Sequence, residues 1–112
     1  MAIKEKIEGD IALLTISGKL MGGNETKEIT EKVNSLLSDG IRKIVMDLGK
    51  VKWMNSTGLG ALIESRRLIT DKDGVLKLAA VADKIKSLLI ITQILNLFET
   101  YETADRAVGS FK

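Results

Sequence analysis

Hydrophobic and polar residues alternate near the start of the chain. Residues 3–7 read Ile-Lys-Glu-Lys-Ile, a pattern typical of a half-exposed edge strand, and residues 11–16 form a second, more apolar run. The segment Glu8-Gly9-Asp10 between them supplies turn residues. A short connection that contains Gly between two such runs predicts an antiparallel β-hairpin.

Apolar residues then recur at helical spacing. The pattern predicts a helix over residues 25–38, which Asn24 would cap and which Gly40 would end with a positive φ. The apolar stripe of this helix consists of Ile29, Val33, Leu36 and Leu37. An apolar run at 44–48 follows and predicts a strand that is covered on both faces.

A second helix is predicted after the polar residues Asn55-Ser56-Thr57. One of its sides carries the apolar residues Leu59, Leu62, Ile63 and Ile69. Another side carries Gly60, Glu64, Arg67 and Asp71. The helix would therefore bury its first side against the sheet and present its second side to solvent.

The last third of the chain repeats the alternation of strand and helix. We expect a strand at 75–81, a helix capped by Asp83, a short strand at 98–101 and a final helix from Thr103 to about Gly109. Alternation of this kind implies βαβ crossovers. The sequence therefore predicts a single α/β domain over residues 1–112, with a mixed, mainly parallel sheet flanked by about four helices.

Composition excludes several kinds of site. The 112 residues include no Cys and no His, which removes disulfides, thiolate metal sites and the commonest general base. A nucleophile elbow around Ser56 would need Gly where Met54 stands, and no phosphate-binding loop motif is present. We therefore expect no enzyme activity, no cofactor and no metal.

Charge and hydropathy define the expected setting. The net charge is only +2 and the charges are interspersed, so nothing indicates a nucleic-acid partner. The N-terminal residues lack an apolar signal region, and the apolar stretch at 88–98 is too short and too interrupted to span a membrane. That stretch fits either a core segment or a docking surface. We expect a cytoplasmic protein without membrane contact that is a monomer or a weak dimer when free.

The segment from residue 44 to residue 60 holds the candidate chemistry. It presents Ser56 and Thr57 at the start of a helix, where free N–H groups and the helix dipole favour an anion. Two readings of Ser56 are open: a phosphate acceptor or a helix-capping residue. Asn55 can itself be the cap, and Asp47 can bond amides of the loop that follows its strand. Gly58 and Gly60 would allow close approach, either of a partner or of the sheet.

The same segment resembles a known signature. Asp47-Leu48, followed by Trp53-Met54-Asn55-Ser56-Thr57-Gly58-Leu59-Gly60, resembles the STAS domain and, more narrowly, the anti-sigma factor antagonists of bacteria. That family often has Asp where Asn55 stands, and an acid where Met21 stands. The resemblance implies that Ser56 is phosphorylated by a partner serine protein kinase that is also the anti-sigma factor. Thr57 is a minor candidate for the same modification.

The resemblance also implies a mechanism of partner switching. The unphosphorylated protein would bind the anti-sigma factor and release a sigma factor, phosphorylation would end the binding, and a phosphatase would restore it. The predicted partner-binding residues are Asn55, Ser56, Thr57, Gly58, Gly60, Glu64 and Arg67. The alternative is a STAS docking module that is not phosphorylated and serves another bacterial signalling complex.

Overall fold

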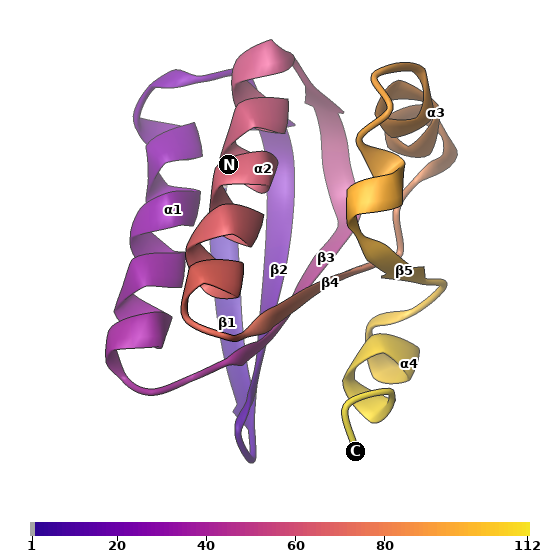
Figure 1. The fold of residues 1–112 in the computed structure, drawn as a ribbon. Helices are drawn as coiled ribbons and strands as arrows, with labels where there is room; N and C mark the ends of the chain where they lie inside the picture. The colour runs from indigo at the N-terminus through magenta and orange to yellow at the C-terminus, as the bar shows by residue number, and fades with distance from the viewer. Residues whose placement is uncertain (1) are drawn as a thin grey trace.

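The predicted hairpin forms one edge of a five-stranded sheet (Figure 1). The structure is a computed structural model that describes residues 2–112. Strand β1 (Ala2–Glu8) pairs antiparallel with β2 (Ile11–Leu20). Gly9, with φ of 63°, lies in the two-residue turn between them, where a positive φ favours glycine. This geometry confirms the antiparallel start of the sheet.

The remaining strands are parallel to β2. They are β3 (Lys43–Met54), β4 (Val75–Ala79) and β5 (Glu99–Tyr101), and the strand order is β1-β2-β3-β4-β5. The predicted mixed and mainly parallel sheet is thus confirmed. Because the parallel strands all end at the same edge, the segments that follow β2 and β3 meet there.

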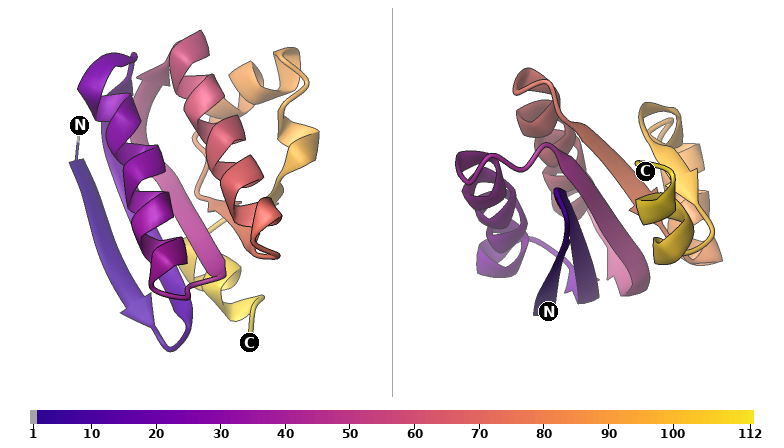
Figure 2. Two further views of the ribbon diagram at one scale, coloured as in Figure 1. Left: turned by 60° about the vertical axis from the view of Figure 1, so that its left-hand side comes forward. Right: turned by 90° about the horizontal axis from the view of Figure 1, so that it is seen from below.

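Four α-helices connect and cover the strands. They are α1 (Gly23–Ser38), α2 (Ser56–Asp71), α3 (Asp83–Ile91) and α4 (Ala104–Gly109), and a short 3₁₀ helix η1 (Leu95–Leu97) precedes β5. Helices α1 and α2 lie side by side across the sheet, as Figures 1 and 2 show. Their first turns lie at the same end of the molecule.

The sheet separates two hydrophobic layers. Successive residues of a strand point to opposite faces, so Ile44 and Met46 join the larger cluster, which also holds apolar residues of α1, α2 and α3. Val45, between them, joins a smaller cluster with Ala107 and Val108 of α4. Helix α4 therefore covers the face of the sheet opposite to α2.

Two of the predicted helix caps are wrong. Helix α1 begins at Gly23, so Asn24 lies inside it; Gly22 is the N-cap, and its N–H donates to Thr26 Oγ1 at 2.8 Å. Helix α3 begins at Asp83 itself, after Ala82. An acid inside the first turn still complements the helix dipole.

The other two helix-boundary predictions are confirmed. Gly40 has φ of 89° and follows Asp39, the C-cap of α1. Thr103 caps α4 by accepting a hydrogen bond from the Arg106 N–H at 3.1 Å.

The structure corrects two further expectations. The strand predicted at 44–48 continues to Met54, so only Asn55 separates β3 from α2. In α2, Ile63 is 39% exposed and Ser65 is fully buried. Helix α1 covers the side of α2 that carries Ala61, which shifts the buried arc toward Ser65 and away from Ile63.

The apolar stretch near residue 90 is divided between core and surface. Leu89 and Ile94 are buried and join the larger hydrophobic cluster. Ile90, Ile91 and Leu97 are exposed. Only part of this stretch therefore serves the core.

Candidate functional site

Asn55 begins the helix that carries the candidate site. Its backbone is extended, with φ of −102° and ψ of −171°, and its Oδ1 accepts a hydrogen bond from the Gly58 N–H at 3.0 Å. The Leu59 N–H donates to the Asn55 carbonyl at 2.9 Å. Asn55 is thus the N-cap of α2, one of the roles expected for it, and Ser56 is relieved of capping.

Ser56 is the first residue of α2 and is exposed to solvent. Its hydroxyl forms no hydrogen bond with the backbone of residues 2–112 or with the side chains that the structure describes there. The first N–H groups of a helix lack partners within the helix, so an acceptor on Ser56 would find donors there. The side chain is free to meet another molecule.

Thr57 is also exposed but has a neighbour. A Cβ built on Gly22 would lie 3.4 Å from Thr57 Cγ2. The side chain of Thr57 therefore rests against the loop between β2 and α1.

Gly58 lies in a crowded environment and Gly60 in an open one. A Cβ on Gly58 would lie 2.9 Å from Leu20 Cβ and 3.0 Å from Met54 Cβ, whereas one on Gly60 would meet no atom within 4 Å. Gly58 is buried and serves the contact between helix and sheet, while Gly60 is exposed. Of the two roles that the sequence left open, Gly58 takes the packing role.

A shallow groove of about 410 Å³ runs between α1 and α2. From α2 it is lined by Thr57, Gly60, Ala61 and Glu64, and from α1 by Gly23, Thr26, Lys27 and Thr30. The four α1 residues are not among the predicted partner-binding residues. No local pattern marks them, because the pairing of α1 with α2 is a tertiary contact.

Glu64 and Arg67 form one charged network with Asp71. Arg67 Nε donates to Glu64 Oε2 at 3.1 Å, Nη2 bonds Glu64 Oε1, and Nη1 donates to Asp71 Oδ2 at 2.9 Å. These bonds from Arg67 lower the pKa of Glu64, and Glu64 in turn raises the pKa of Arg67. Arg67 is thus already engaged on the helix surface, and the three side chains together carry one net negative charge.

Three residues before the site have structural roles. Asp47 Oδ1 accepts from the Gly49 N–H at 2.9 Å, the amide-bonding role expected for it, although Gly49 lies inside β3. Trp53 is 36% exposed and has the Lys84 Nζ 5.6 Å from its ring centroid, while Met54 is buried. Met54 therefore packs in the core, and Trp53 lies at its rim.

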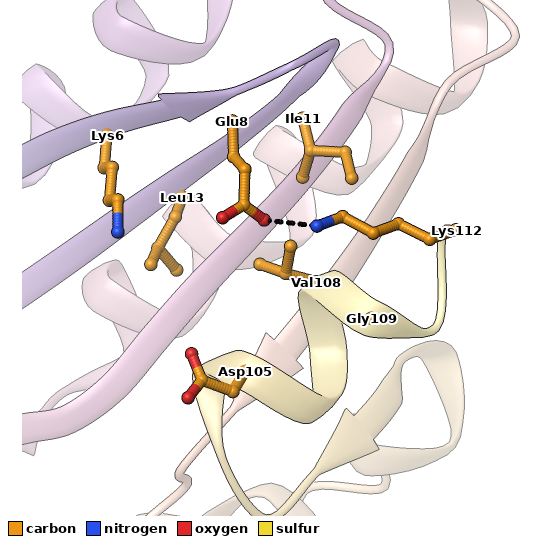
Figure 3. Close-up of a pocket in the computed structure, with 8 residues that line it drawn as sticks. All are labelled: Lys6, Glu8, Ile11, Leu13, Asp105, Val108, Gly109 and Lys112. Carbon is orange, nitrogen blue, oxygen red and sulfur yellow. Dashed lines mark hydrogen bonds and ion pairs between the residues drawn. The ribbon is translucent and has the colours of Figure 1, made fainter.

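Another hollow, of about 250 Å³, lies between the hairpin and α4 (Figure 3). Ile11, Leu13 and Val108 provide its apolar wall, and Glu8 is paired with Lys112 at 2.8 Å. That bond lowers the pKa of Glu8. The charged groups at its rim, Lys6, Glu8, Asp105 and Lys112, balance in sign, so the hollow selects neither cations nor anions.

One known protein family matches nearly the whole chain. Residues 2–107 match the model of the STAS domain. The chain belongs to the STAS domain family. Over 75 residues, 67% of its length, this STAS domain is 32% identical to the anti-sigma-B factor antagonist of Staphylococcus aureus, of which the match covers 69%.

Solved structures share the fold at low identity. A Thermotoga maritima protein described as a candidate anti-sigma factor antagonist has a TM-score of 0.87 and 22% identity, over 96% of this chain and 92% of that one. SpoIIAA of Bacillus in its phosphorylated form has a TM-score of 0.79 and 14% identity, over 99% and 100%. The unphosphorylated form of SpoIIAA has a TM-score of 0.75 at 14% identity, over 98% and 97%.

The Staphylococcus aureus relative, at 32% identity, indicates the general class of this STAS domain. It belongs with the anti-sigma factor antagonists, a family of regulators that are generally not enzymes. Within residues 2–112, no group of three or more acidic side chains is arranged to hold a metal ion. No helix of that range combines the length and the apolar character that crossing a membrane requires.

Proposed function

We propose that this STAS domain binds an anti-sigma factor that is also a serine kinase, and that phosphorylation of Ser56 ends the binding. The observation that carries the proposal is the free, exposed hydroxyl of Ser56 at the first position of α2. A kinase needs an accessible hydroxyl without internal partners. In this scheme the domain is a substrate and performs no catalysis itself.

Ser56 suits the acceptor role better than Thr57. The Thr57 side chain packs against Gly22. Thr57 is also β-branched, which restricts its rotamers. Thr57 remains the minor candidate.

The fold can accommodate the modification. A phosphate adds nearly two negative charges, and the start of α2 offers unpaired N–H groups and the positive end of the helix dipole. The likeness to both forms of SpoIIAA supports this reasoning, because the fold is present in the phosphorylated and the unphosphorylated protein. Phosphorylation would therefore change the surface rather than unfold the domain.

The partner surface would centre on α2. Ser56, Thr57, Gly60 and Arg67 are exposed and Glu64 is half-buried, so these side chains can meet a partner over the groove beside α1. Asn55 and Gly58 belong to this surface through the backbone that they hold in place. Two added charges at Ser56 would oppose any acidic or apolar partner surface, at a cost of several kcal/mol.

The scheme places the domain in a cycle. The unphosphorylated form would sequester the anti-sigma factor and free a sigma factor in the cytoplasm, and a phosphatase would restore that form after phosphorylation. The anti-sigma-B factor antagonist of Staphylococcus aureus, at 32% identity, supports the choice of partner class.

Two measurements test the proposal. The tryptic peptide from Trp53 to Arg66, taken from protein purified from its own host, should gain a phosphate on Ser56 that phosphatase removes. Binding to the anti-sigma factor encoded in the same genome should persist in Ser56→Ala and fall at least tenfold in Ser56→Asp. Ser87→Asp, which adds the same charge at an exposed position of α3, is the matched control and should bind normally.

Two other results would contradict the proposed phosphorylation switch. Equal binding by Ser56→Asp and Ser56→Ala would contradict the switch. A peptide that stays unmodified under every growth condition, together with retained binding, would instead identify a docking module that phosphorylation does not regulate.

A further inference from the structure

Asn55 uses both ends of its side-chain amide. Its Oδ1 accepts from the Gly58 N–H at 3.0 Å, and its Nδ2 donates to the Met21 carbonyl at 2.9 Å. Capping a helix requires only the acceptor. The second bond spans 34 positions of sequence and requires a donor. An ionised Asp has no donor, and the single hydroxyl of Ser or Thr is shorter than the amide of Asn and cannot occupy both of its positions.

The second bond holds the loop between β2 and α1. In that loop Gly22 has φ of 101°, and its N–H donates to Thr26 Oγ1 at 2.8 Å. The loop is thus tied to α1 by Thr26 and to the start of α2 by Asn55. Each of these two contacts is a single side-chain hydrogen bond.

The loop lies next to the candidate site. Met21 is 50% exposed, Gly22 is close to the Thr57 side chain, and Gly23 lines the groove between α1 and α2. The position of the loop therefore decides whether Met21 and the mouth of the groove are presented together with Ser56.

We propose that Asn55 is a positioning residue that fixes the loop from Met21 to Gly23 against the start of α2, so that the partner binds this loop and Ser56 as one surface. This inference rests on the proposed function, which supplies the partner. It also assigns a role to the neutral amide. A carboxylate at position 55 would keep the cap but turn a second negative oxygen toward the Met21 carbonyl, and repulsion would open the loop.

Amide hydrogen exchange at Gly22 tests the loop contact in the full chain, because the Gly22 N–H and the Met21 carbonyl belong to the same peptide unit. In Asn55→Asp, loss of the bond to the Met21 carbonyl should free this unit and raise exchange at Gly22 about tenfold, while exchange at Gly58 and Leu59 changes less than about twofold. Asn55→Ser, which is neutral and too short to reach Met21, should give the same result at Gly22. Unchanged exchange at Gly22 in both variants would overturn the proposal.

A second variant removes the hydrogen bond between the loop and Thr26 of α1. Thr26→Val removes the hydroxyl that accepts from Gly22 but leaves Asn55 and the cap of α2 untouched. If loop position governs recognition, Thr26→Val and Asn55→Asp should both weaken binding to the anti-sigma factor about tenfold. Wild-type binding in both variants would overturn the positioning role.

These experiments distinguish an error in the proposed function from an error in the proposed role of Asn55. If the wild-type domain binds no anti-sigma factor, the proposed function is wrong, and the exchange rates at Gly22 still decide whether Asn55 holds the loop. If the wild-type domain binds and both loosened variants bind equally well, the function stands and the role of Asn55 in recognition is wrong.

Discussion

Gly58 lies directly against the end of β2 at Leu20. A Cβ added to Gly58 would approach the Leu20 carbonyl oxygen too closely for any real contact, and it would lie 2.9 Å from the Leu20 Cβ. The backbone of Leu20 also accepts a hydrogen bond from the Asn55 N–H at 3.1 Å. The start of α2 is therefore seated on the sheet by backbone contact, which leaves Ser56 facing outward.

Gly58→Ala should destabilise the domain by about 1–3 kcal/mol, because the new methyl group meets backbone that cannot move without opening the sheet. Gly60→Ala is the matched control in the same helix, where open space and higher helix propensity predict a gain of about 0.5–1 kcal/mol. Urea unfolding followed by Trp53 fluorescence measures both. Similar effects of the two substitutions would contradict this account.

Ser65→Ala should stabilise the domain by about 1 kcal/mol. The Ser65 side chain is fully buried, and its hydroxyl has no hydrogen-bond partner among the described residues. Replacing a buried unsatisfied hydroxyl with a methyl group removes a desolvation penalty, and Ala is also the better helix former. Thermal and urea unfolding check the prediction, and a loss of stability would show that the hydroxyl has a partner in solution.

Lys77 should anchor the C-terminal segment. It is 6% exposed, its Nζ donates to Ser110 Oγ at 2.7 Å, and it lies 4.0 Å from the centroid of the Phe111 ring. Lys77→Ala should cost about 2–4 kcal/mol through lost packing and lost polar contacts. Lys77→Met keeps most of the aliphatic packing and should cost less.

Hydrogen exchange locates the effect of the Lys77 variants. Amides of α4 should exchange faster in Lys77→Ala, and those of α2 should change little. Uniform acceleration across the whole chain would show instead that Lys77 supports the entire fold and not one segment.

The pKa of Glu64 should depend on Arg67. In the folded protein the hydrogen bonds from Arg67 lower the pKa of Glu64 below its ordinary value of 4.5. The sign follows from linkage: the stabilisation is present above the unfolded pKa and is lost as the pH falls through the lowered folded value. An NMR titration of the Glu64 carboxyl should show a midpoint below 4.5, and Arg67→Met should return it toward that value. An unchanged midpoint in Arg67→Met would exclude the guanidinium as the cause.

Local sequence determined most of the secondary structure. Turn residues and two-residue alternation defined the hairpin, and strand-helix alternation predicted the parallel strands that follow it. Asn55 and Thr103 act as caps because a cap is a contact within four residues of its own helix. Where two capping solutions compete locally, the sequence was insufficient: at α1 the bond from Gly22 to Thr26 replaced the expected cap by Asn24.

Tertiary structure decided which faces are buried and which distant residues meet. Ile63, expected on the buried side, is exposed and Ser65 is buried because α1 packs beside α2, and nothing within α2 records the position of α1. The bond from Asn55 to Met21, 34 residues away, follows from the parallel pairing of β2 with β3, which brings both strand ends to one edge of the sheet. The sequence by itself therefore determined the elements and the exposed hydroxyl at position 56. Only the packed fold placed the loop and the groove beside it, because those contacts depend on how the helices and strands assemble in space.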